Sequence, residues 1–367
     1  MTLLRPGRLL LLLLAALLLY LLLWPVPVEP VAWDAPADRG LVDPFAPNDR
    51  LRAAWPIDLG PHRGPEDVAG GPDRFLYAPT EDGKIIRFLP NGGQLQVFAD
   101  VGGRPLGIEF DREGNLVVAN AILGIQRVDR QGRVALLLGA IDGEPLIYAN
   151  DLAVADDGRI FVTQATSKFS PADWGGTYAG SLLDILEHGG HGSVIAYDPA
   201  SGKARRLMQD LDFANGIAIS DDQQFLLVNE TGHYRVWRYW LAGASSGEAE
   251  LILENLPGFP DNINNGLNGR FWIGLVAPRN ALLDSLAPYP SLRKAVQRLP
   301  AALRPAAERS SHVIGIDGHG VVLMNLQDTA ATVPALTGVY EDAGQLYLTT
   351  LFGSMLPRLD KGDLALN

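Results

Sequence analysis

The feature that most constrains this chain is a phrase repeated six times. Each copy has a short apolar strand, a turn rich in Asp, Gly or Asn, and a second, stronger apolar strand. The copies begin at residues 66, 106, 150, 215, 261 and 337, at intervals of 40, 44, 65, 46 and 76 residues. The shorter intervals match the roughly 40–50 residues of a four-stranded propeller blade.

Such units cannot bury their apolar faces alone, and closing them into a ring removes the exposed strand edges. The sequence therefore predicts an all-β fold, a six-bladed β-propeller. The last copy lacks one strand before the chain ends. We expect a strand from about residues 50–58 to complete that blade.

An uncharged, leucine-dominated run covers residues 9–28. About 20 apolar residues are needed to cross a bilayer as a helix. Arg5 and Arg8 precede the run, which favours a cytoplasmic N-terminus, and Trp24 occupies an interfacial position. We expect an uncleaved signal anchor, a transmembrane helix, within residues 1–28. A cleaved signal peptide is the alternative, although no clear cleavage site follows.

The expected domain organisation follows from this run. Residues 29–48 are rich in proline and predict a stiff linker, and residues 49–367 form the propeller. The protein would be a single-pass membrane protein with its propeller outside the cytoplasm, in the periplasm if the membrane is a bacterial inner membrane.

Composition excludes several classes of function. The net charge is −12 and no basic stripe offsets it, which argues against a nucleic-acid partner. The chain has no cysteine, so disulfides, zinc–thiolate sites and cysteine nucleophiles are excluded. No G-x-S-x-G motif occurs, which argues against an α/β-hydrolase. The residues do not specify an oligomeric state.

Four of the repeats open with an oxygen-bearing side chain at the same place: Glu66, Asn150, Asn215 and Asp261. Innermost propeller strands line the central tunnel, so equivalent starts converge around its axis. An all-oxygen set suits a hard cation, and calcium accepts six to eight oxygen ligands. Asn262 could add a further ligand. Any one of these residues alone would be interpreted as a turn residue. Four oxygen-bearing residues at equivalent positions of the repeat predict a calcium site.

The phrases YANDLAV, TSKF, GSVIAYDPASGKARRL, FANGIAIS, LVNET and ENLPGFPDNI carry a family resemblance across residues 50–360. The chain resembles the strictosidine-synthase-like and gluconolactonase (senescence marker protein) propellers, above all their adipocyte plasma-membrane-associated protein-like members. Paraoxonases are more distant relatives. The resemblance implies calcium ligands at Glu66, Asn150, Asn215 and Asp261, with Asp261 as catalytic base or nucleophile.

Two departures from the family affect the expected mechanism. Leu106 and Ala121 stand where paraoxonase-like members carry histidines, so a histidine dyad is not expected. The primary hypothesis is a calcium-dependent hydrolase of a lactone or small ester, with calcium polarising the carbonyl. The alternative is a non-catalytic, membrane-anchored propeller that binds a partner or lipid. A strictosidine-synthase-like condensing enzyme is a further alternative, which the calcium set found here disfavours because plant synthases largely lack it.

Two insertions and several polar residues complete the candidates. Residues 167–190 and 279–310 interrupt the repeat, and insertions at one blade end usually form lids. The second has helical spacing and is basic. It would pack on the rim or, alternatively, rest on anionic lipid. Asn120, Glu230 and His233 follow strands and could reach the pocket, whereas His188 and His191 lie in a glycine-rich loop or lid.

Overall fold

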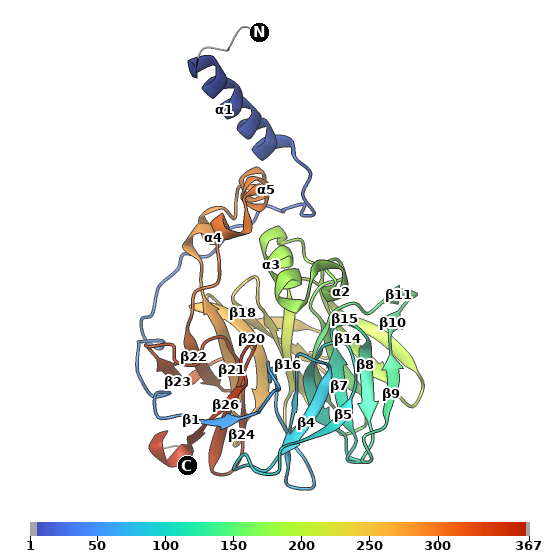
Figure 1. Ribbon diagram of the computed structural model, residues 1–367. Coiled ribbons are helices and arrows are strands. Elements are labelled where there is room, and N and C mark those ends of the chain that lie inside the picture. Colours follow the sequence, from blue (N-terminus) through green and yellow to red (C-terminus); the bar gives the residue numbers. More distant parts are fainter. Residues whose placement is uncertain (1–5, 365–367) are drawn as a thin grey trace.

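The computed structural model describes residues 6–364, which form a six-bladed β-propeller with helices gathered at one end (Figure 1). Every blade is a four-stranded antiparallel sheet whose first strand faces the axis. Blade one contains β2 (Ala69–Gly70), β3 (Leu76–Pro79), β4 (Lys84–Phe88) and β5 (Gln96–Asp100). Blade two contains β6 (Pro105–Phe110), β7 (Leu116–Asn120), β8 (Gly124–Val128) and β9 (Val134–Leu138). A hairpin of β10 (Ala140–Ile141) and β11 (Glu144–Pro145) follows.

Blades three to five repeat this plan. Blade three contains β12 (Ala149–Val154), β13 (Ile160–Gln164), β14 (Gly192–Asp198) and β15 (Lys203–Leu211). Blade four contains β16 (Ala214–Ile219), β17 (Phe225–Glu230), β18 (Arg235–Trp240) and β19 (Ala249–Leu253). Blade five contains β20 (Gly258–Asn265), β21 (Phe271–Pro278), β22 (Ser311–Ile316) and β23 (Val322–Asp328).

Blade six joins the two ends of the chain. It contains β24 (Leu336–Glu341), β25 (Gln345–Thr350), β26 (Met355–Asp360) and, as its outermost strand, β1 (Trp55–Asp58). Trp55 pairs with Arg358 and Asp58 with Met355, antiparallel. This confirms the strand expected to close the ring. A short 3-10 helix, η2 (Lys361–Leu364), follows β26.

The Asp and Gly residues between strands form the turns that the repeat predicts. Asp73, Asp129, Asp157 and Asp317 each accept a hydrogen bond from the backbone N–H two residues further on, at 2.8–3.2 Å. Short aspartate side chains stabilise tight turns in this way. The turns reverse the chain between short strands, and antiparallel blades result.

The hydrophobic core is divided among the six interfaces between neighbouring blades. One cluster of buried residues lies at each interface, and the alternating apolar positions of both blades supply it. Ile57 on β1 packs with Leu76 of blade one and Leu356 of blade six. Because these residues leave water only when neighbouring blades meet, the sixth interface closes the ring and completes the core.

The two insertions form helices over one end of the propeller (Figure 1). Residues 167–190 contain α2 (Pro171–Trp174) and α3 (Thr177–Glu187). Residues 279–310 contain α4 (Ala281–Ser285), α5 (Pro290–Arg298) and the 3-10 helix η1 (Ala301–Leu303). We call these two insertions the lid. Its basic side chains bond within the protein, to Asp284, Glu29 and several backbone carbonyls, which favours packing on the rim over the lipid alternative.

The N-terminal run is helical over α1 (Pro6–Leu23), which projects away from the propeller (Figure 1). Over residues 6–364 no helix is long and apolar enough to cross a membrane, so the expected transmembrane helix is not found. Pro25 and Pro27 cannot continue the helix, and Val28 is buried against Phe169 and Leu183 of the lid. Arg5 lies outside the described residues.

Residues 26–48, here called the strap, form no helix or strand and run along the lid and the propeller. The backbone N–H of Val31 donates to the Glu187 carbonyl oxygen at 2.9 Å. Trp33 stacks on His188, with ring centroids 3.9 Å apart. The segment expected to be a linker is therefore packed against the lid.

Candidate functional site

A cavity of about 760 Å³ lies at the lid end of the propeller axis. The starts of innermost strands form its floor, and the lid forms most of its walls, with Pro27 of the strap and loops of blade six completing them. Its lining includes four of the five predicted site residues: Glu66, Asn150, Asn215 and Asp261. The convergence that the repeat predicts is therefore present in the structure.

A β-bulge accompanies three of these positions, Asn150, Asn215 and Asp261, in the innermost strands. Pairing with the second strand shifts register between Ala149 and Leu152, between Ala214 and Ile217, and between Pro260 and Ile263. A bulge turns a side chain out of the regular alternation of the strand. Blades two and six carry the same irregularity, at Leu106 and Thr337. The bulge thus presents one residue in each of blades two to six, and that residue bears oxygen in all of them except blade two. Glu66 lies before β2, whose pairing has no such shift.

Oxygen atoms of three site residues are buried and have no hydrogen-bond partner among the described residues: Glu66 Oε2, Asn150 Oδ1 and Asn215 Oδ1. Burying such acceptors without partners is unfavourable by about 1–3 kcal/mol each. Asn215 uses only its amide nitrogen, which donates to Thr231 Oγ1 at 3.1 Å. These three oxygens, one from a carboxylate and two from side-chain amides, are therefore available to coordinate a cation.

The electrostatics of the cavity floor favour a cation. Burial, followed by the nearby Asp261 carboxylate, raises the pKa of Glu66 well above its usual range. Burial also raises the pKa of Asp261. The positive charge of Arg104 lowers the pKa of Glu66 and so opposes part of this rise. The Arg104 guanidinium donates its hydrogen bond to the Gly64 carbonyl oxygen rather than to the Glu66 carboxylate. A hard cation among these oxygens would restore the ionised forms, so the residues fit calcium.

Asn262, the fifth predicted ligand, does not line the cavity. Its amide nitrogen donates to the Glu66 carbonyl oxygen at 2.9 Å, across the propeller axis. Asn229 donates similarly to the carbonyl oxygen of Asp261 at 2.7 Å, and the Thr337 hydroxyl to that of Glu66 at 2.7 Å. Asn262, Asn229 and Thr337 position the main chain of the site. Sequence reasoning missed the last two, although Asn229 lies in the quoted phrase LVNET.

Two further carboxylates join neighbouring blades below the site. Asp67 accepts from the N–H of Ile108 and Asp151 from that of Ile217, both at 2.9 Å. Such contacts require close approach of the blades. A Cβ on Gly216 would lie 2.2 Å from the backbone nitrogen of Ile263. The acidic residue after Glu66 and after Asn150 is therefore a blade connector.

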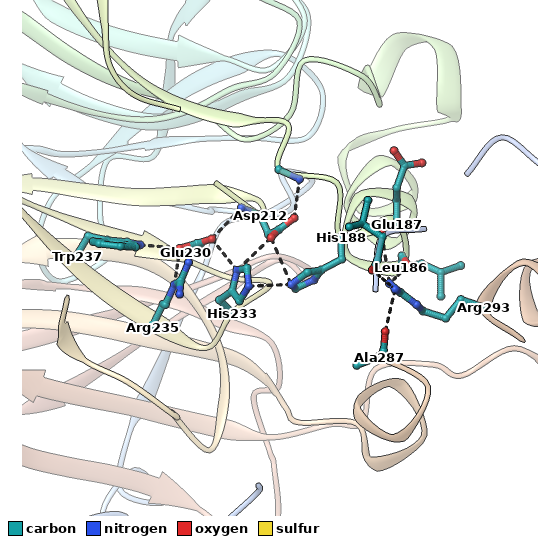
Figure 2. Close-up of polar contacts among 12 residues, drawn as sticks. Leu186, Glu187, His188, Asp212, Glu230, His233, Arg235, Trp237, Ala287 and Arg293 are labelled. Carbon is teal, nitrogen blue, oxygen red and sulfur yellow. Dashed lines mark hydrogen bonds and ion pairs between the residues drawn. The ribbon is translucent and has the colours of Figure 1, made fainter. Parts of the chain in front are cut away.

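The other candidates from the sequence have different surroundings. Leu106 and Ala121 pack with Tyr148 and Phe213 into an apolar patch beside the site. No histidine lines the cavity within the described part of the chain. Asn120 is bonded to neighbouring backbone and to Gln126, a structural role. Glu230 and His233 do not line the cavity. His233 contacts His188 instead, and Glu230 contacts His233 (Figure 2).

Comparisons with known proteins agree with this architecture. Residues 150–244 match the family model for strictosidine synthase, and residues 43–88 match that for the strictosidine synthase-like N-terminal region. The chain is 32% identical over 342 residues to adipocyte plasma membrane-associated protein of Salmo salar, covering 86% of this chain and 80% of that one.

The chain belongs to the strictosidine-synthase-like family.

Solved structures support the fold of this strictosidine-synthase-like propeller. A gluconolactonase from Xanthomonas campestris superposes with a TM-score of 0.60 at 22% identity, covering 91% of this chain and 98% of that one. Regucalcin from Agrobacterium tumefaciens, described as a calcium-binding protein, gives 0.57 at 14% identity, covering 84% and 93%. At these identities the likeness establishes the propeller fold alone.

Proposed function

We propose that this chain is a calcium-dependent hydrolase that cleaves an ester or lactone in the propeller cavity. The observation that carries the proposal is the set of unpartnered, buried oxygens of Glu66, Asn150 and Asn215 beside Asp261. A gluconolactonase and a calcium-binding protein among the structural neighbours support it.

The side chains divide the chemistry between them. Glu66, Asn150, Asn215 and Asp261 would hold the ion, which when bound supplies positive charge to stabilise the oxyanion of the attacked carbonyl. Asp261 is the candidate base. It accepts a proton from water as the water oxygen bonds to the carbonyl carbon. It then returns that proton to the leaving oxygen as the bond between this oxygen and the carbonyl carbon breaks.

The walls of the cavity favour a substrate with an apolar part. Leu106, Tyr148, Phe213 and Phe259 surround the floor, and Trp174, Tyr178, Leu182 and Leu283 extend from the lid. Aromatic and aliphatic walls with a few convergent polar groups are typical of small-molecule sites. The apolar contacts would orient the acyl portion, and the lid would limit access of bulk water.

Thermal unfolding of the full chain, with calcium and with chelator, tests the metal site. We expect calcium at 100 times its Kd to stabilise the folded state by about 2.7 kcal/mol. Glu66→Gln should lose this shift, whereas Glu81→Gln, a surface carboxylate of the same blade, should keep it. The full chain is required because the strap packs on the lid. An unfolding midpoint that is the same with calcium and with chelator would contradict the calcium site.

Turnover is measured on the same samples with a panel of lactones and aryl esters. Hydrolysis that disappears with chelator supports the enzyme. A calcium-dependent midpoint without turnover of any substrate would favour the non-catalytic alternative, for which the apolar patch around Leu106 and Ala121 is the supporting observation.

We also propose that α1 attaches the propeller to a membrane. Leucines around this helix are exposed, among them Leu11, Leu18 and Leu23. Arg298 of α5 donates to the Leu21 carbonyl oxygen at 2.8 Å, which fixes the end of α1 to the lid. The name of the adipocyte plasma membrane-associated protein supports this location. The periplasmic location stays a prediction.

Flotation with phospholipid vesicles tests the attachment. The full chain should float with vesicles, and a variant carrying Leu11→Asp and Leu18→Asp should remain at the bottom of the gradient. The paired change Asp156→Asn and Asp157→Asn, on a propeller turn, is the control and should still float. Flotation of the aspartate variant at the native level would contradict membrane attachment through α1.

A further inference from the structure

A second cluster of titratable side chains lies beside the lid, outside the lining of the calcium cavity (Figure 2). His188 caps the C-terminus of α3, Asp212 lies between β15 and β16, and His233 lies in the turn after β17. Glu230, the last residue of β17, adjoins His233. Three separate connections thus bring two imidazoles and two carboxylates together.

The candidate ligand atoms are closely spaced. His188 Nε2 lies 3.1 Å from His233 Nε2 and 3.3 Å from Asp212 Oδ2. One ligand atom from each of His188, Asp212 and His233 lies within 4.8 Å of the others. Tetrahedral zinc with bonds of about 2.0–2.1 Å separates its ligand atoms by about 3.3–3.4 Å. The two distances from His188 Nε2 match this separation. Asp212 Oδ2 also lies 3.1 Å from His233 Nδ1, a contact that a small shift of the Asp212 carboxylate towards the ion would replace.

Two of the three proposed ligands, His188 and Asp212, are buried, and His233 is partly buried. His188 Nδ1 is buried and unpartnered among the described residues.

Glu230 is arranged as an orienting group for His233. Its Oε1 lies 2.7 Å from His233 Nδ1, and its Oε2 accepts from Arg235 and Trp237 at 2.6 Å each. A carboxylate on Nδ1 fixes the tautomer whose Nε2 lone pair is free, the arrangement common behind metal-bound histidines. That nitrogen is the one facing His188.

We propose that His188, Asp212 and His233 form a site for one divalent transition-metal ion of the zinc class, oriented by Glu230. Two imidazoles distinguish it from the all-oxygen calcium site. The His233 side chain keeps 23% of its surface exposed, so the cluster is not sealed from solvent.

The site would act as a structural clamp in a chain that has no cysteine. It joins the end of α3 to blade four, directly under Trp33 of the strap. An ion there would hold lid, strap and propeller together. The inference does not depend on calcium or on hydrolysis.

Cobalt and zinc binding by the tag-free full chain tests the site, with calcium in excess so that the cavity is saturated. We expect one Co²⁺ per chain, with visible absorption bands that Zn²⁺ abolishes, and a higher unfolding midpoint with Zn²⁺. His233→Ala should eliminate the bands. Glu230→Gln should weaken the affinity about 10- to 100-fold. His319→Ala, at an exposed histidine elsewhere on the propeller, should bind as the native protein does.

Two results would overturn the proposal. One is absence of stoichiometric Co²⁺ or Zn²⁺ binding, which would leave a hydrogen-bonded histidine pair. The other is equal binding by the native chain and His233→Ala. Because Glu230 is fully buried, its variant risks misfolding. His233→Ala, at a partly exposed position, decides the question alone. Glu66→Gln should retain Co²⁺ binding, which separates this outcome from failure of the calcium site.

Discussion

Replacing Asp261 with Asn should lower kcat/KM for any lactone or ester substrate by about 10²–10⁴-fold, the range expected when a general base is removed. The same change should have opposite effects on stability with and without calcium. Without calcium, Asp261 is buried beside the Glu66 carboxylate, and burial raises the pKa of both groups. A neutral Asn removes this repulsion, so the variant should be at least as stable as the native chain.

With calcium present the order reverses, because the native chain gains the binding free energy and the variant loses an anionic ligand. Chemical denaturation in both buffers measures the two differences. Asp151→Asn is the matched control, a buried carboxylate outside the cavity lining that accepts from Leu152 and Ile217. It should destabilise by about 1–3 kcal/mol in either buffer. If Asp261→Asn behaved like this control, Asp261 would be a structural residue rather than a ligand and base.

Replacing Arg293 with Met should release the lid and the strap and lower the free energy of unfolding by several kcal/mol, because each buried carbonyl oxygen left without its donor costs about 1–3 kcal/mol. Arg293 is fully buried on α5 and donates to four backbone carbonyls. Three belong to Leu186 and Glu187 of α3 and to Ala287 (Figure 2). The fourth belongs to Val31 of the strap. Met fills similar space but leaves all four acceptors without this donor.

Chemical denaturation and limited proteolysis of residues 26–48 measure the change. Strap cleavage should accelerate, because the strap must leave the lid before a protease can bind it. Lys294→Met, at the next residue of α5, is the control. Its ion pair with Glu29 is partly exposed, so the change should stay within about 1 kcal/mol. Equal cleavage rates for native chain and Arg293→Met would show that the strap is held by its apolar contacts instead.

The fold was predictable because the sequence of each repeat alone identifies its strands and turns. Strand alternation and the Asp and Gly turns identify a blade without reference to the others, and an incomplete sixth copy implies a closing strand near residues 50–58. The four cavity residues were predictable for the same reason, since Glu66, Asn150, Asn215 and Asp261 occupy one place in a periodic pattern.

Contacts between non-equivalent parts of the chain were not predictable. His188, Asp212 and His233 come from three connections of different length, and no spacing in the sequence relates them. The packing of Val28 and Trp33 depends on the lid, whose helices have no repeat to place them. Asn262 was predicted as a fifth ligand because it adjoins Asp261. Its amide nitrogen donates to the Glu66 carbonyl oxygen and its Oδ1 is buried without a partner among the described residues, so its role as a ligand stays a prediction.

The pairing of β1 with β26 has a consequence for synthesis on the ribosome. The two strands are separated by about 300 residues, so at about 5–20 residues per second roughly 15–60 s of translation pass between them. Throughout that time the nascent chain can stack its early blades, but Ile57 has no Leu356 to pack against. The pairing of β1 with β26 can therefore form only after translation has passed residue 355, and a polypeptide released earlier would leave the ring of blades open.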